Sequence, residues 1–146
     1  MTIAVDFDVP VHSYHQGWQD GSIYGDETPG AFQALRDLMA IDSVFIHTTR
    51  PPEPVAVWLT EHGGFATVAD DGTLGIEFWN RRGILLVTNR KYPAHAYIDD
   101  RAVPFTGDWA QAIAATAELV PVLRVQDHTG APARLLNRVT RPRGEH

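Results

Sequence analysis

The chain has 146 residues, no cysteine, 44% hydrophobic and 21% charged side chains, and a formal net charge of −6. These values are typical of one globular domain with a hydrophobic core. The absence of cysteine excludes disulfides, thiolate catalysis and cysteine-based zinc sites. No apolar run is long enough to span a membrane, and strand-forming sequence begins at residue 3, which leaves no room for a signal peptide. We therefore expect a cytoplasmic protein with no membrane partner.

The charge is unevenly distributed along the chain. Residues 1–121 carry 7 basic and 16 acidic side chains, whereas residues 122–146 carry five arginines and only two acids. We therefore expect a globular domain at residues 1–121 and an Arg-rich, partly disordered segment at residues 122–146. A basic tail on an acidic body can contact nucleic acid, but a solvated terminus is the simpler interpretation.

Short apolar runs alternate with helical patterns through the first 119 residues. One strand is expected to begin at residue 3, and three more are expected at residues 43–47, 84–87 and 94–98. Helices are expected at about residues 28–39, 53–62 and 108–119. Thr28-Pro29 is typical of an N-cap followed by Pro at the first helical position. This order predicts an α/β fold with a doubly wound parallel sheet, in the Rossmann-like three-layer αβα arrangement.

Additional short strands are expected between these elements. Asp20-Gly21 lies between Trp18 and Tyr24 and predicts a β-hairpin flap at about residues 13–26. Asp71-Gly72 predicts a second hairpin within residues 65–80. Residues 101–105 and 122–125 have the composition of short strands.

Polar residues follow several of the expected strands. Because the carboxyl ends of parallel strands meet at one edge of a sheet, we expect these side chains to converge there. Hard oxygen ligands favour Mg²⁺, and a cation with an ammonium group can neutralise a phosphoryl group. The residues concerned are Asp6, Asp8, Thr48, Asp99 and Asp100, together with Lys91, the only lysine of the chain.

The order of these motifs resembles the haloacid-dehalogenase-like (HAD) superfamily of Mg²⁺-dependent phosphohydrolases. Val5-Asp6-Phe7-Asp8 is similar to its first motif, an apolar strand that ends in Asp-x-Asp. Val44-Phe45-Ile46-His47-Thr48 is similar to the second, Lys91 to the basic third, and Tyr97-Ile98-Asp99-Asp100-Arg101 to the fourth. The resemblance covers residues 3 to about 119.

The resemblance implies a phosphomonoester hydrolase with an aspartyl-phosphate intermediate. Asp6 would attack phosphorus, and Asp8 would protonate the leaving group and later activate water. Thr48 and Lys91 would orient and neutralise the phosphoryl group.

The resemblance also implies where Mg²⁺ would be held. Its ligands would be Asp6, the backbone carbonyl of Asp8, and Asp99, with Asp100 close by or acting through water. The implied partner is therefore a phosphorylated substrate.

Val9-Pro10 departs from the family pattern, which usually has Gly followed by Thr or Val. Proline removes an N–H and favours extended geometry at Val9. An alternative hypothesis is therefore a catalytically weak or inactive phosphate- or nucleotide-binding protein.

The lengths between motifs leave no room for a large cap domain. Only 19 residues, 9–27, follow the first motif, and 42 residues, 49–90, separate Thr48 from Lys91. An open site can admit a small molecule or an exposed phosphate on a macromolecule, or can be closed by an oligomer. A nucleic-acid end-processing phosphatase is a further alternative. Tyr14, Trp18 and Tyr24 can stack on a base, although packing of the flap is the simpler interpretation.

Two histidines lie close to residues of the expected site in the sequence. His12 can orient a leaving group, although a polar loop residue is the simpler interpretation. His47, by strand alternation next to Thr48, is expected on the opposite face, packed or at the surface.

Overall fold

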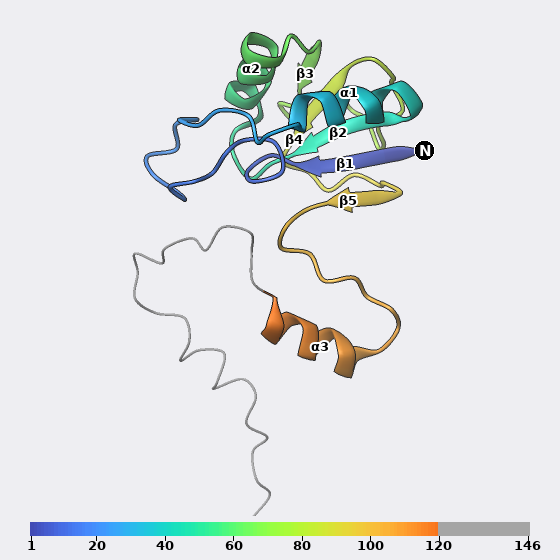
Figure 1. The fold of residues 1–146 in the computed structure, drawn as a ribbon. Coiled ribbons are helices and arrows are strands. Elements are labelled where there is room, and N and C mark those ends of the chain that lie inside the picture. Colours follow the sequence, from blue (N-terminus) through green and yellow to red (C-terminus); the bar gives the residue numbers. More distant parts are fainter. Residues whose placement is uncertain (120–146) are drawn as a thin grey trace, which may run out of the picture.

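The computed structural model describes residues 1–119 and shows an α/β fold with a five-stranded sheet (Figure 1). The strands are β1 (Thr2–Asp6), β2 (Ser43–His47), β3 (Thr67–Ala69), β4 (Leu85–Thr88) and β5 (Ala96–Ile98). The helices are α1 (Ala31–Ile41), α2 (Pro52–Gly63) and α3 (Trp109–Glu118). The strand order is β3-β4-β2-β1-β5, and every pairing is parallel. The predicted parallel α/β fold is therefore confirmed, in a form compatible with a Rossmann-like arrangement.

The first face of the sheet packs against α1 and α2, which lie on the same side of it (Figure 1). Ile3 and Val5 of β1 join Leu35 of α1 and Val55 and Leu59 of α2 in one buried cluster. The central strands are apolar on both faces because both faces are covered, which explains the absence of alternation in their sequences.

The second face is covered by segments that form neither helix nor strand. Trp79 and Tyr92 pack on Ala4, Phe45 and Leu86, which are the β1, β2 and β4 residues of that face.

The predicted third layer of helix is wrong for residues 1–119. Helix α3 has no buried residue and lies away from the sheet (Figure 1). Within residues 1–119, Trp79 and Tyr92 pack on the second face where a helix was expected.

Neither predicted hairpin is formed as paired strands. Within residues 7–30 there are only two isolated bridges, Asp8 with His12 and His12 with Glu27. The Tyr24 hydroxyl donates to the Gly17 carbonyl at 2.8 Å, so side chains bond much of the backbone that strand pairing would have used. In the second case β3 pairs in parallel with β4 and becomes the edge strand.

Other boundaries also differ from those expected. Helix α1 begins at Ala31, after Gly30 (φ 83°), because the Thr28 hydroxyl bonds the Val9 carbonyl and does not cap the helix. Residues 101–105 form no strand, and the predicted strand at 122–125 and the Arg-rich segment lie outside the described residues. Within residues 1–119, no helix has the length and apolar character that a membrane span requires.

Candidate functional site

A pocket of about 220 Å³ opens at the carboxyl edge of the sheet. Asp6 is the last residue of β1, and Asp99 and Asp100 directly follow β5. These acids meet because β5 pairs with β1, with Val5 opposite Ile98. The pocket is lined by Asp6, Asp8, Val9, Tyr14, Trp18, His47, Thr49, Asp99, Asp100 and Arg101.

Three of these acids lie close enough together that they could hold a metal ion. One ligand atom from each of Asp6, Asp99 and Asp100 lies within 4.8 Å of the others. Burial, then the charge of Asp99 and to a smaller extent those of Asp8 and Asp100, raises the pKa of Asp6 to about 7. Such a crowded group of carboxylates requires a positive charge or a bound proton for compensation.

Asp100 gives a second indication of a cation. Burial raises its pKa, and its Oδ2 atom is buried without a hydrogen-bond partner among residues 1–119. Buried carboxylate oxygens are rarely left without a partner. Mg²⁺ prefers oxygen ligands and takes few of them from the protein, so the three acids fit this ion.

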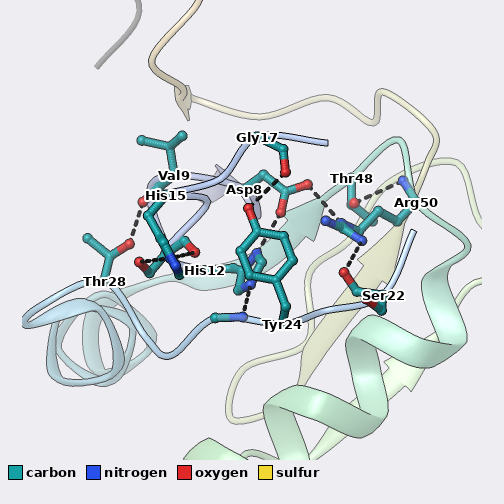
Figure 2. A network of polar contacts seen from close by, with 12 residues as sticks. Asp8, Val9, His12, His15, Gly17, Ser22, Tyr24, Thr28, Thr48 and Arg50 are labelled. Atoms are coloured by element: carbon teal, nitrogen blue, oxygen red, sulfur yellow. Dashed lines mark hydrogen bonds and ion pairs between the residues drawn. The ribbon is translucent and has the colours of Figure 1, made fainter. Parts of the chain in front are cut away.

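Asp8 lies in the same pocket in a different environment (Figure 2). Its Oδ1 atom lies 2.8 Å from Nδ1 of His12, and its Oδ2 atom accepts a hydrogen bond of 2.8 Å from Nε of Arg50. Burial alone would raise the pKa of Asp8, but the bonds from His12 and Arg50 outweigh it and lower the pKa below its ordinary value. Asp8 is therefore held as an anion with both oxygens bound.

His12 is fully buried and connects Asp8 to the following loop. Its Nε2 atom accepts a hydrogen bond of 2.9 Å from the Gly25 amide, which assigns the ring proton to Nδ1 and makes His12 a neutral donor to Asp8. The ring stacks on Phe7 with centroids 5.3 Å apart. His12 does lie in the loop, but its burial and its bond to Asp8 were not predicted.

Arg50 connects the same carboxylate to another part of the loop. Its side chain is only 4% exposed, and its Nη1 atom donates to the Gly21 carbonyl at 2.7 Å and to the Ser22 carbonyl at 3.4 Å. The planar guanidinium can serve both partners because its donors point in different directions.

Val9, the residue after Asp8, has φ 83° and is the only residue other than glycine with a positive φ in residues 1–119. The expectation of extended geometry at Val9 was wrong. Its amide donates to the His12 carbonyl at 2.9 Å, and its carbonyl accepts from the Thr28 hydroxyl at 2.5 Å. These bonds hold a strained conformation that a β-branched residue rarely adopts.

The structure brings four of the six predicted site residues together. Asp6, Asp8, Asp99 and Asp100 line the pocket. Thr48 and Lys91 do not: the Thr48 hydroxyl is buried and accepts from the Arg50 amide at 3.0 Å, and exposed Lys91 has Nζ 5.4 Å from the Tyr97 ring centroid.

His47 lines the pocket, which corrects its predicted placement on the opposite face. The register pairs Asp6 with His47, and parallel partners point to the same side of a sheet. Burial lowers the pKa of His47, which favours its neutral form.

Arg50 does not line the pocket but binds its acid Asp8, and this role was missed because it depends on a tertiary contact. Arg50 is 42 positions from Asp8, and the only indication of its role in the sequence was its place in Thr-Thr-Arg-Pro after a strand.

Comparisons of the chain with protein-family models, with curated proteins and with solved structures gave no match.

Proposed function

We propose that this protein is a Mg²⁺-dependent phosphomonoester hydrolase of the HAD-like type that acts through Asp6. The observation that carries this proposal is the convergence of Asp6, Asp99 and Asp100 within 4.8 Å, with Asp8 in the same pocket. Phosphoryl transfer depends mainly on positioning and charge neutralisation, which such a site can supply.

Asp6, Asp99 and Asp100 would hold the ion, with the Asp8 backbone carbonyl as a further ligand. Bound Mg²⁺ would neutralise phosphoryl oxygens and keep Asp6 ionised, since the pKa of Asp6 is otherwise about 7. Arg101 also lines the pocket and can contribute positive charge toward a phosphoryl group.

In the first step, a carboxylate oxygen of Asp6 forms a bond to phosphorus while the ester P–O bond breaks. The departing oxygen takes a proton from the minor protonated fraction of Asp8, which His12 and Arg50 disfavour, and Asp8 is left as its anion. In the second step, water attacks phosphorus, Asp8 accepts its proton, and inorganic phosphate leaves as the Asp6 carboxylate is restored. His12 and Arg50 favour the ionised form of Asp8, which is the form that activates water.

A second candidate function is phosphate or nucleotide binding without efficient turnover. It is favoured by Val9, which lines the pocket in a strained conformation. The HAD superfamily, which the sequence resembles, usually has glycine at this position. The positions of Thr48 and Lys91 outside the lining of the pocket favour the same candidate.

Hydrolysis of an aryl phosphate with and without Mg²⁺ separates the two candidates. The hydrolase proposal expects Mg²⁺-dependent activity in the parent, loss in Asp6→Asn, and retention in Glu61→Gln, an exposed acid on α2. Equal activity in the parent and in Asp6→Asn would overturn the proposal. Saturable phosphate binding without hydrolysis, with activity appearing in Val9→Gly, would support the second candidate.

A further inference from the structure

We infer that Trp18 is a stacking platform for the base of a phosphorylated nucleoside whose phosphoryl group enters the carboxylate pocket. This inference rests on the proposed function and adds its substrate class. The shared chemistry is a nucleoside monophosphate group, either free or at the end of a nucleic-acid strand.

Trp18 lines the pocket, yet its side chain is 54% exposed. The Arg50 guanidinium lies 5.5 Å from its ring centroid, and a Cβ at Gly21 would lie 3.4 Å from the indole. Tyr14, in contrast, is 8% exposed and belongs to the packed part of the loop. Trp18 thus combines support from a buried arginine with extensive exposure at the pocket, which is the arrangement a planar ligand needs for stacking.

The loop that carries Trp18 is held in place on both sides of it. The Tyr24 hydroxyl bonds both the Gly17 carbonyl and the Gln16 amide, at 2.8 and 3.0 Å. Arg50 bonds the Gly21 and Ser22 carbonyls on the other side. A preordered aromatic platform loses little conformational entropy on binding.

The size of the pocket requires much of the substrate to lie outside it. A volume of about 220 Å³ is below the range of roughly 300–1,000 Å³ that is usual for sites enclosing a whole small ligand. A phosphoryl group held by the acids would therefore leave the rest of its ester at the mouth of the pocket. Trp18 offers a planar surface there, which favours a base over a flexible aliphatic group.

The test compares a nucleoside 5′-monophosphate with ribose 5-phosphate, which carries the same phosphorylated alcohol without a base. We expect Trp18→Ala to raise KM for the nucleotide by roughly 10-fold, with kcat and the constants for ribose 5-phosphate unchanged. Trp18→Phe should largely restore KM. Trp109→Ala is the matched control, since Trp109 is 72% exposed on α3 and does not line the pocket.

A KM change that is equal for both substrates would overturn the inference, because Trp18 would then act only on loop structure. The same holds if the parent hydrolyses both with equal kcat/KM, an outcome that leaves the proposed function intact. A 5′-phosphorylated oligonucleotide forms a second arm: a higher kcat/KM than for the mononucleotide assigns the strand end, and a lower one assigns the free nucleotide.

Binding to Asp6→Asn distinguishes failure of this inference from failure of the hydrolase proposal. The nucleotide should quench tryptophan fluorescence in Asp6→Asn, ribose 5-phosphate should not, and addition of Trp18→Phe should remove the quenching. Quenching without turnover in the parent would retain the platform and reject the hydrolase. Absence of quenching would reject the platform.

Discussion

Arg50 and Asp8 form an ion pair, with Nε of Arg50 2.8 Å from Oδ2 of Asp8, across 42 residues of sequence. Arg50 is 4% exposed and Asp8 is 21% exposed, so the pair lies largely out of water. The same guanidinium bonds the loop carbonyls of Gly21 and Ser22. One side chain therefore connects the acid of the pocket with the loop that carries Trp18.

Arg50→Ala should destabilise the protein by about 2–3 kcal/mol, because Asp8 would lose a charged donor and the loop carbonyls would lose theirs. Arg50→Lys should recover only part of the loss, since one ammonium cannot reproduce the fork of guanidinium donors. Urea unfolding measures both values. Arg81→Ala is the control, because exposed Arg81 only covers the Trp79 ring, and its effect should be below about 1 kcal/mol. Equal effects of Arg50→Ala and Arg81→Ala would contradict the assigned contacts.

His12→Phe should cost about 3 kcal/mol. Phe can keep the stacking on Phe7, but it leaves the Asp8 carboxylate and the Gly25 amide without their partner. His12→Asn should cost less, because its amide can still donate toward Asp8. Denaturant midpoints compare the two variants with His15→Phe, an exposed site where a change within about 0.5 kcal/mol is expected. A smaller loss for Phe than for Asn would argue against the hydrogen-bonded role of His12.

Val9→Gly should be more stable than Val9→Ala by about 1 kcal/mol, because φ 83° strains any residue with a Cβ. Thermal unfolding should show this as a difference of about 3–6 °C in Tm. Val57 supplies the opposite case: it is exposed within α2, where Gly should be less stable than Ala by a similar amount. Val9→Gly below Val9→Ala would mean that the strained conformation is not populated in solution.

Asp6 should make the stability of the metal-free protein depend on pH. Its pKa of about 7 in the folded state exceeds the ordinary 3.8, so the folded protein binds more protons between these values. The contribution of Asp6 to the free energy of unfolding is therefore fully present below about pH 4 and is lost as pH rises through about 7. The free energy of unfolding of Asp6→Asn, relative to the parent, should rise across this window.

Mg²⁺ should have the opposite pH dependence, since it binds the ionised carboxylates. The Tm increase caused by Mg²⁺ should grow as pH rises toward 7 and should be much smaller in Asp6→Asn. Differential scanning calorimetry at several pH values measures both effects. A Tm increase that is independent of pH, or unchanged in Asp6→Asn, would contradict a metal site at these acids.

The local pattern of the chain was sufficient for the sheet. Ile3, Val5, Val44 and Val87 belong to short apolar runs that only a sheet covered on both faces can bury, and all of them are in the core. The same logic placed Asp6 and Asp99 at one edge, since parallel strands end together. These predictions rest on two features that can be read along the chain: which short runs are apolar enough to be buried, and which residues follow each run in the direction of the chain.

Register and loop contacts were decided only by the tertiary structure. Strand alternation does not determine which residue of β2 lies beside Asp6. The sequence analysis expected Thr48 in the pocket, whereas the register places His47, one residue earlier, beside Asp6. The Asp20-Gly21 signal for a hairpin was outweighed by bonds from Tyr24 and Arg50 to the loop backbone. Likewise, the positive φ of Val9 depends on the Thr28 hydroxyl and the His12 carbonyl.

The sequence by itself determined the parallel sheet and placed four acids at the carboxyl ends of its strands, because apolar runs and the residues that follow them are local features. The pairing of β5 with β1, which brings Asp99 and Asp100 to Asp6, was decided by the tertiary structure. The tertiary structure decided that Asp8 is held by His12 and Arg50 and that Trp18 lies at the pocket. The physical reason is that these contacts depend on segments far apart in the sequence, whereas the periodicity of apolar residues predicts only local helices and strands. The contacts form only when burial of the core has brought those segments together.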